Sequence, residues 1–253
     1  MGMFLQPSIL ISGCLTLTFL SALPVAAGAQ GASAPVAVHD IAYDQAKQMV
    51  SFGLQNFGTQ EITAFSYSLT VSKPGSEPLV YTETIDLLPL FSHRSLGPLI
   101  GYSGSDSFRP GETYSVHSYL PTPWGDLSGA PVEVRATAVV YADCSAVGDD
   151  RLIEHVFKAR ESGGRELKEI LRAVKAIPRD EAFPDGLKSV AESFGAHSHP
   201  YGLANSWSSG GASLAANFEK TYERLGYKGF DILIQGHELQ ADAMLASSKR
   251  KEK

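Results

Sequence analysis

Histidines in the C-terminal third are the side chains best suited to metal chemistry. His237 and Glu238 begin the His-Glu-x-x-His pattern of zinc peptidases, in which two histidines four residues apart face one metal ion. Ala241 stands at the second ligand position, so the motif is incomplete. His197 and His199 lie two residues apart and would point the same way on an extended segment. A metal-dependent hydrolase using His197, His199 and His237 is therefore the alternative to a non-enzymatic protein.

Carboxylates form a second candidate group. Asp143, Asp149 and Asp150 lie between the last predicted strand and the first predicted helix, and oxygen ligands from such loops suit Ca²⁺. Their spacing does not match the alternating acidic positions of an EF-hand. An Asx turn followed by a helix cap explains all three residues, and we expect that role.

Aromatic side chains in predicted loops form a third group. Tyr102 lies in loop 90–107 and Trp124 in loop 121–130, where they are candidates for a surface that binds a protein or a glycan. A carbohydrate-binding module is therefore a second alternative. The chain has no Gly-x-Ser-x-Gly elbow and no Walker loop. We predict no catalytic residue and no cofactor from the sequence.

The elements that would position these side chains begin after an apolar N-terminal segment. Residues 1–29 contain no Asp, Glu, Lys or Arg and end in small residues, which predicts a secretory signal peptide cleaved between Ala29 and Gln30. Two alternatives remain open: acylation at Cys14, in a sequence similar to a lipoprotein box, or an uncleaved anchor. In each case we expect export to the periplasm or the exterior, with membrane contact only transient unless Cys14 is lipidated or the segment stays attached.

The composition of the chain is that of a globular protein with an acidic balance. Apolar residues make up 43%, charged residues 19%, and the formal net charge is -6, which opposes nucleic-acid binding. The C-terminal basic cluster, made of Lys249, Arg250, Lys251 and Lys253, is expected to form a solvated tail. Without Cys14, the chain keeps only Cys144, so no internal disulfide is predicted. We expect Cys144 to act as a small buried hydrophobe; a reactive thiol is the alternative.

After a linker at 30–35, residues 36–145 are predicted to form a β-domain. Short runs rich in β-branched and aromatic residues alternate with turn clusters, with strands predicted at 47–55, 62–71, 79–87, 113–120 and 132–141. In the last run, Val132, Val134, Ala136, Ala138 and Val140 are expected to share one face. Strands at this spacing without intervening helices predict an antiparallel β-sandwich.

The turns of this region carry a family resemblance. Asn56-Phe57-Gly58-Thr59 and Pro110-Gly111-Glu112 precede predicted strands. Together with Glu61–Phe65, Tyr141–Asp143 and Gly148–Asp150, they resemble uncharacterised exported bacterial proteins with immunoglobulin-like or fibronectin-like sandwiches. The resemblance covers about half the chain and implies an immunoglobulin-like fold. The Cys and Trp pair of antibody domains is absent.

The remaining sequence predicts a smaller α-helical region. Residues 146–195 form a helical segment, 196–211 a Gly/Ser/His-rich loop, and 212–253 a helical and partly disordered tail. Helices are predicted from 151, from 165 to 177, from 183 to 194, from 212 to 225 and from 236 to 246. Ser162-Gly163-Gly164 is expected to end the first of these helices and separate it from the second. The sequence thus predicts an exported, non-enzymatic interaction or structural module whose partner is an unidentified protein or glycan.

Overall fold

A computed structural model describes residues 35–73, 75–88, 108–120, 127, 129–195 and 210–251. Several predicted features lie outside these residues. They are the signal segment with Cys14, Ala29 and Gln30, the aromatic candidates Tyr102 and Trp124, and the histidines His197 and His199.

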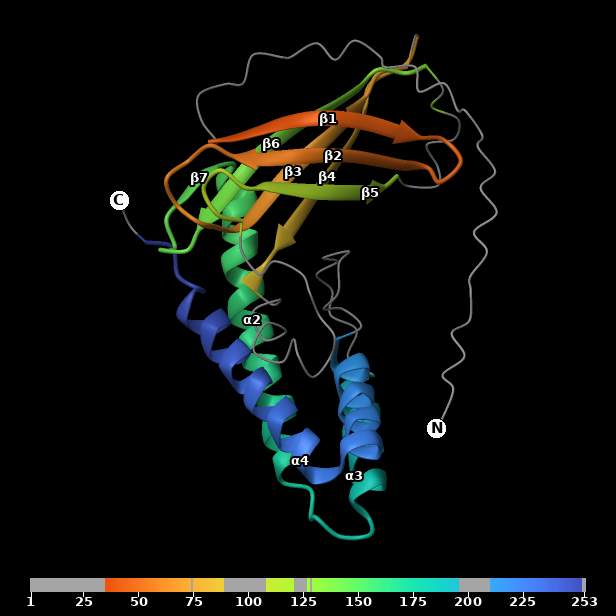
Figure 1. Cartoon of the computed structure of the whole chain (residues 1–253), viewed down its shortest axis with the longest axis vertical. Coiled ribbons are helices and arrows are strands. Elements are labelled where there is room, and N and C mark those ends of the chain that lie inside the picture. Colours follow the sequence, from red (N-terminus) through yellow and green to blue (C-terminus); the bar gives the residue numbers. More distant parts are fainter. Residues whose placement is uncertain are drawn as a thin grey trace, which may run out of the picture.

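The described chain is mainly β, followed by a helical region, as predicted. Figure 1 shows the strands gathered at one end and the helices extending away from them. The strands are β1 (Val36–Asp44), β2 (Met49–Asn56), β3 (Ile62–Val71), β4 (Leu79–Asp86), β5 (Thr113–Tyr119), β6 (Val132–Tyr141) and β7 (Ala146–Gly148). The helices are α2 (Asp150–Lys175), α3 (Phe183–Gly195) and α4 (Gly210–Ala246), which we call the helical arm.

The strands form two antiparallel sheets that share one apolar core. Sheet 1 has the order β1-β2-β5 and sheet 2 the order β4-β3-β6-β7. Buried side chains from both sheets belong to the same cluster, among them Phe52 of β2 and Tyr67 of β3, whose rings meet edge to face with centroids 4.9 Å apart. Burial of this apolar surface is the main force that holds the two sheets together.

Strand β3 has the predicted bounds and the predicted alternation. Phe65, Tyr67, Leu69 and Val71 belong to the shared core, while Ser66 and Ser68 lie on the opposite face. Strand β1 and the short strand β7 were not identified individually from the sequence. Because β7 pairs with β6, sheet 2 extends to Gly148, three residues past the predicted end of the β-domain.

The prediction that alternate residues of 132–140 share one face is wrong beyond Ala136. Ser66 pairs with Ala138 and Tyr67 with Ala136, so the register shifts and Thr137 is an extra residue. A bulge of this kind reverses the faces of all residues that follow it. Ala138 and Val140 therefore leave the shared core and pack under helix α2.

Helix α2 begins where its cap predicts and continues where an interruption was expected. Asp149 is the N-cap, and its side chain accepts hydrogen bonds from the backbone N–H groups of Arg151 and Leu152. The expected break at 162–164 is wrong, because α2 is continuous to Lys175. A Cβ at Gly163 would lie 2.8 Å from Met244 Cε, and one at Gly164 would lie 2.8 Å from Leu245 Cγ. The glycines thus allow close approach of α4 rather than end the helix.

Helix α4 also differs from its prediction. It spans Gly210–Ala246, including the interval left between the two predicted helices, but Gly226 has φ 62° and breaks the helical path. Glycine adopts this left-handed φ without the steric cost that a Cβ imposes. The two halves of α4 pack on α2 and α3 around a second apolar core that contains Leu171, Phe183 and Phe230.

The first turns of α2 join the helical arm to sheet 2. Ile153, Val156 and Phe157 pack against Ala64, Ala138 and other small residues on the face of sheet 2 that points away from sheet 1. The small side chains let the helix approach the sheet closely. Among the described helices, none has a stretch of sufficient length and hydropathy to cross a lipid bilayer.

Candidate binding groove and its supports

Arg160 is a buried cation at the junction of the arm and sheet 2. It is fully buried, and its guanidinium forms two parallel hydrogen bonds to Asp86 at the end of β4: Nε to Oδ2 at 2.9 Å and Nη2 to Oδ1 at 3.0 Å. The Asp86 carboxylate also accepts a hydrogen bond from the backbone N–H of Leu88 at 3.1 Å. A two-point arginine–carboxylate contact fixes both distance and orientation.

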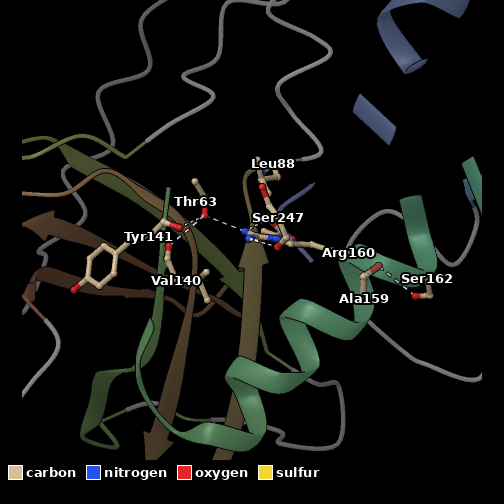
Figure 2. A network of polar contacts seen from close by, with 9 residues as sticks. Thr63, Leu88, Val140, Tyr141, Ala159, Arg160, Ser162 and Ser247 are labelled. Carbon is tan, nitrogen blue, oxygen red and sulfur yellow. Dashed lines mark hydrogen bonds and ion pairs between the residues drawn. The ribbon is translucent and has the colours of Figure 1, made fainter. Parts of the chain in front are cut away.

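Two further contacts extend this junction to β3 and α4. Figure 2 shows the Arg160 side chain between Thr63 and Ser247. Arg160 Nη2 donates to Thr63 Oγ1 at 3.0 Å, and Nη1 donates to the Ser247 carbonyl at 3.4 Å. Thr63 in turn donates to the carbonyls of Val140 and Tyr141, both at 3.3 Å. One side chain of α2 therefore contacts two strands and the residue just after α4.

The C-terminal residues form a second junction, with the β6–β7 turn and with the first residue of α2. Lys251 Nζ lies 3.1 Å from Asp143 Oδ2, and Arg250 Nη1 lies 2.7 Å from Asp150 Oδ1. The backbone N–H of Lys251 also donates to the Cys144 carbonyl at 3.0 Å. Arg250 and Lys251 are exposed, as expected for a solvated tail, and they also pair with aspartates 100 and 108 positions earlier in the chain.

The three aspartates of the candidate calcium loop have other partners. Asp143 accepts hydrogen bonds from the hydroxyl and the backbone N–H of Ser145, and these bonds, together with Lys251, hold the pKa of its carboxyl well below the usual range. Asp149 caps α2 and Asp150 pairs with Arg250. These contacts agree with the expected turn and cap roles. Cys144 is half-buried in the β6–β7 turn with φ 66° and packs at the rim of the apolar contact beneath α2.

The packing of α2 against the second half of α4 is reinforced by a row of ion pairs. Lys168 lies 2.8 Å from Asp242, and Lys175 lies 2.7 Å from Glu238. Just beyond the end of α2, Arg179 pairs with Asp231, an interaction that lowers the pKa of the Asp231 carboxyl. The pairs follow the antiparallel course of the two helices and set their register.

A groove of about 660 Å³ lies along this seam, which we call the α2–α4 groove. It combines apolar and charged side chains from both helices. Helix α2 contributes Lys168, Leu171, Arg172 and Lys175, and α4 contributes Gln235, Glu238, Leu239 and Asp242.

Two lining residues of the groove differ from the rest. Leu239 is 57% exposed, so its side chain is available to another molecule. Arg172 lies between Lys168 and Lys175 on the same face of α2, and within the described part of the chain it forms no ion pair with a carboxylate. An exposed apolar side chain beside a cation that lacks such a partner is suited to binding another molecule.

His237, the described member of the histidine group, has a packing role. It is buried, its Nδ1 lies 2.9 Å from Gln240 Oε1, and its ring packs edge to face on Phe218. Glu238, the other residue of the incomplete peptidase motif, pairs with Lys175. The structure therefore does not place these two side chains around a common centre. Over residues 35–195 and 210–251, leaving aside the gaps, no group of three His, Cys, Asp or Glu side chains could hold a metal ion.

The sequence analysis did not identify Arg160, Arg172 or Leu239, although each leaves a signal. Arg160 falls within the apolar stripe of α2, at helical spacing between Phe157 and Gly164, where a cation is unexpected. Leu239 is the reverse, an apolar residue on a charged face. Such exceptions to a helical pattern are visible in sequence, but their partners on other elements are not.

Comparison with known proteins adds little to this description. No protein-family model matches the chain, and no curated protein matches it. One similar solved structure is the 1.85 Å X-ray structure of a hypothetical protein from Peptoclostridium difficile 630, with a TM-score of 0.31 and 11% identity over 48% of this chain and 90% of that chain. A similarity at this level supports no statement about the fold or the function of this protein.

Proposed function

We propose that the protein is an exported, non-enzymatic interaction module that presents the α2–α4 groove on an arm fixed to an immunoglobulin-like sandwich. The observation that carries the proposal is the groove itself, in which an exposed Leu239 lies beside Arg172, a cation without a carboxylate partner among the described residues. Covering the exposed Leu239 side chain would contribute apolar burial to binding, and Arg172 would contribute a charged contact.

The strand order supports the immunoglobulin-like part of the proposal. In that fold one sheet contains strands A, B, E and D and the other C, F and G, with an additional C′ strand beside C in the variable type; among the described residues no strand corresponds to D. The order β1-β2-β5 corresponds to A-B-E, and β4-β3-β6-β7 corresponds to C′-C-F-G. The core filled from both sheets also agrees with this assignment.

The two junctions support the role of the arm. A groove on a loosely attached helix pair would lose binding free energy to the ordering of the arm when a partner binds. Arg160 and Lys251 attach the sheet-proximal end of the α2–α4 pair, where α2 begins and α4 ends, to sheet 2 and to its β6–β7 turn. The groove is thus preorganised.

Export and partner binding are tested in the organism that encodes the protein. We expect the mature protein outside the cytoplasm with Gln30 as its first residue, as measured by the mass of its N-terminal peptide. Chemical crosslinking of intact cells should then yield an adduct that Leu239→Glu abolishes. The matched control is Leu225→Glu, which changes an exposed leucine of α4 that does not line the groove. A cytoplasmic protein, or an adduct equally sensitive to both changes, would contradict the proposal.

A further inference from the structure

The α2–α4 groove has a shape that suits a particular kind of partner. Its two walls are antiparallel helices, and the row of ion pairs runs along their seam. A third helix packs into such a seam by placing its own row of side chains between the two ridges. Leu239, the exposed apolar side chain of the lining, would then contact an apolar position of that helix.

The charged side chains that line the groove favour a partner with one sign of charge. Helix α2 contributes three cations to the lining and α4 contributes two carboxylates, which are paired with Lys168 and Lys175. Arg172 is the remaining positive charge of this lining, and it stands between the two paired lysines on α2. The local balance is thus positive, opposite in sign to the net charge of -6 for the whole chain.

We propose that the groove binds an acidic amphipathic helix of another protein, with an apolar side chain against Leu239 and a carboxylate on Arg172. This inference rests on the proposed function, because it names the partner of the same groove. Arginine offers a planar fork of donors that matches a carboxylate, which makes Arg172 the residue that sets the charge preference. A second copy of this chain and a basic helix are the competing occupants.

The test is a selection from a displayed library of amphipathic helices on the immobilised mature protein. The library keeps leucine at helical spacing and varies the flanking positions among Glu, Gln and Lys. We expect Glu to be enriched over Lys by about tenfold, the effect of one charge-assisted hydrogen bond. Arg172→Glu should reverse the preference toward Lys, and Leu239→Glu should remove enrichment altogether.

Arg224→Glu is the matched control, because it reverses an exposed arginine of α4 that does not line the groove. The preference for Glu should be unchanged in this variant. Enrichment of Lys, absence of any charge preference, or an Arg172→Glu protein that still selects Glu would overturn the inference. The inference would also be overturned if the library gave no enrichment and the protein instead self-associated in a way that Leu239→Glu abolishes. That result would leave an interaction role for the groove intact.

Discussion

Two parallel hydrogen bonds join Arg160 to Asp86 at the junction of the arm and sheet 2. Arg160 is fully buried, whereas the Asp86 side chain is 21% exposed. Removal of one member of a buried pair leaves the other charge without compensation, which typically costs about 3 to 5 kcal/mol. The contribution of this junction to the free energy of unfolding therefore depends on Arg160 and Asp86 together.

For Asp86→Ala we expect a loss of about 3 kcal/mol in the free energy of unfolding, measured by urea denaturation. Arg160→Met in the same background should restore part of that loss, because the uncompensated charge is then removed. A double variant whose loss equals the sum of the two single losses would contradict coupling between the two side chains.

The pairing of Asp143 predicts a pH effect at the second junction. Since its pKa in the folded protein is lowered, its contribution to stability is present at neutral pH and is lost as the pH falls below about 4, the usual range of an aspartate. As the pH falls from 7 toward 3, the difference in unfolding free energy between the wild type and Asp143→Asn should be constant at first and begin to narrow below about pH 4. A constant difference across this range would show that the charge of the Asp143 carboxylate does not account for the effect of the substitution.

At the scale of elements, the glycines of α2 determine how closely α4 approaches. In an exposed helix, replacing glycine with alanine stabilises by about 1 kcal/mol. At Gly164 the new Cβ would meet Leu245 and the carbonyl oxygen of Ala241 at 3.2 Å or less, so overpacking opposes that gain.

We therefore expect Gly164→Ala to lower the melting temperature despite its higher helix propensity. The control is Ser162→Ala, since Ser162 lies two residues earlier in α2 and is exposed. That change should leave the melting temperature nearly unchanged. A Gly164→Ala protein more stable than the wild type would show that the helices can separate at no cost.

The same elements show which parts of the fold can be predicted from sequence. Strand β3 was predicted to the residue because its alternation from Phe65 to Val71 is local. The face reversal in β6 was missed because a one-residue bulge is visible only against the partner strand. Gly163 and Gly164 look like a break in sequence, and only the presence of α4 explains their role.

For the candidate site, the sequence could predict the cap at Asp149 but none of the groove. The cap depends on contacts two or three residues away. Arg160 and Asp86 are 74 residues apart, and Lys251 and Asp143 are 108 residues apart. Two residues so far apart in the sequence leave no periodic pattern that would pair them. From the sequence alone, such charged side chains are therefore predicted to be solvated.

At the scale of the whole molecule, we expect the arm and the sheets to act as one body. The apolar contact beneath α2, the Arg160 junction and the C-terminal junction all cross between the two parts. If these contacts fix the arm, the groove keeps its geometry when no partner is bound. If they do not, the arm is a separate unit and the groove is not preorganised.

Pulsed hydrogen exchange across a urea titration tests this most directly, since it follows peptides of β3 and of α4 in the same sample. We predict that both lose protection at the same urea concentration in the wild type, and that α4 loses it first in Asp86→Ala. Loss of protection in α4 well before β3 in the wild-type protein would contradict the central claim that the sheets hold the arm and its groove in place.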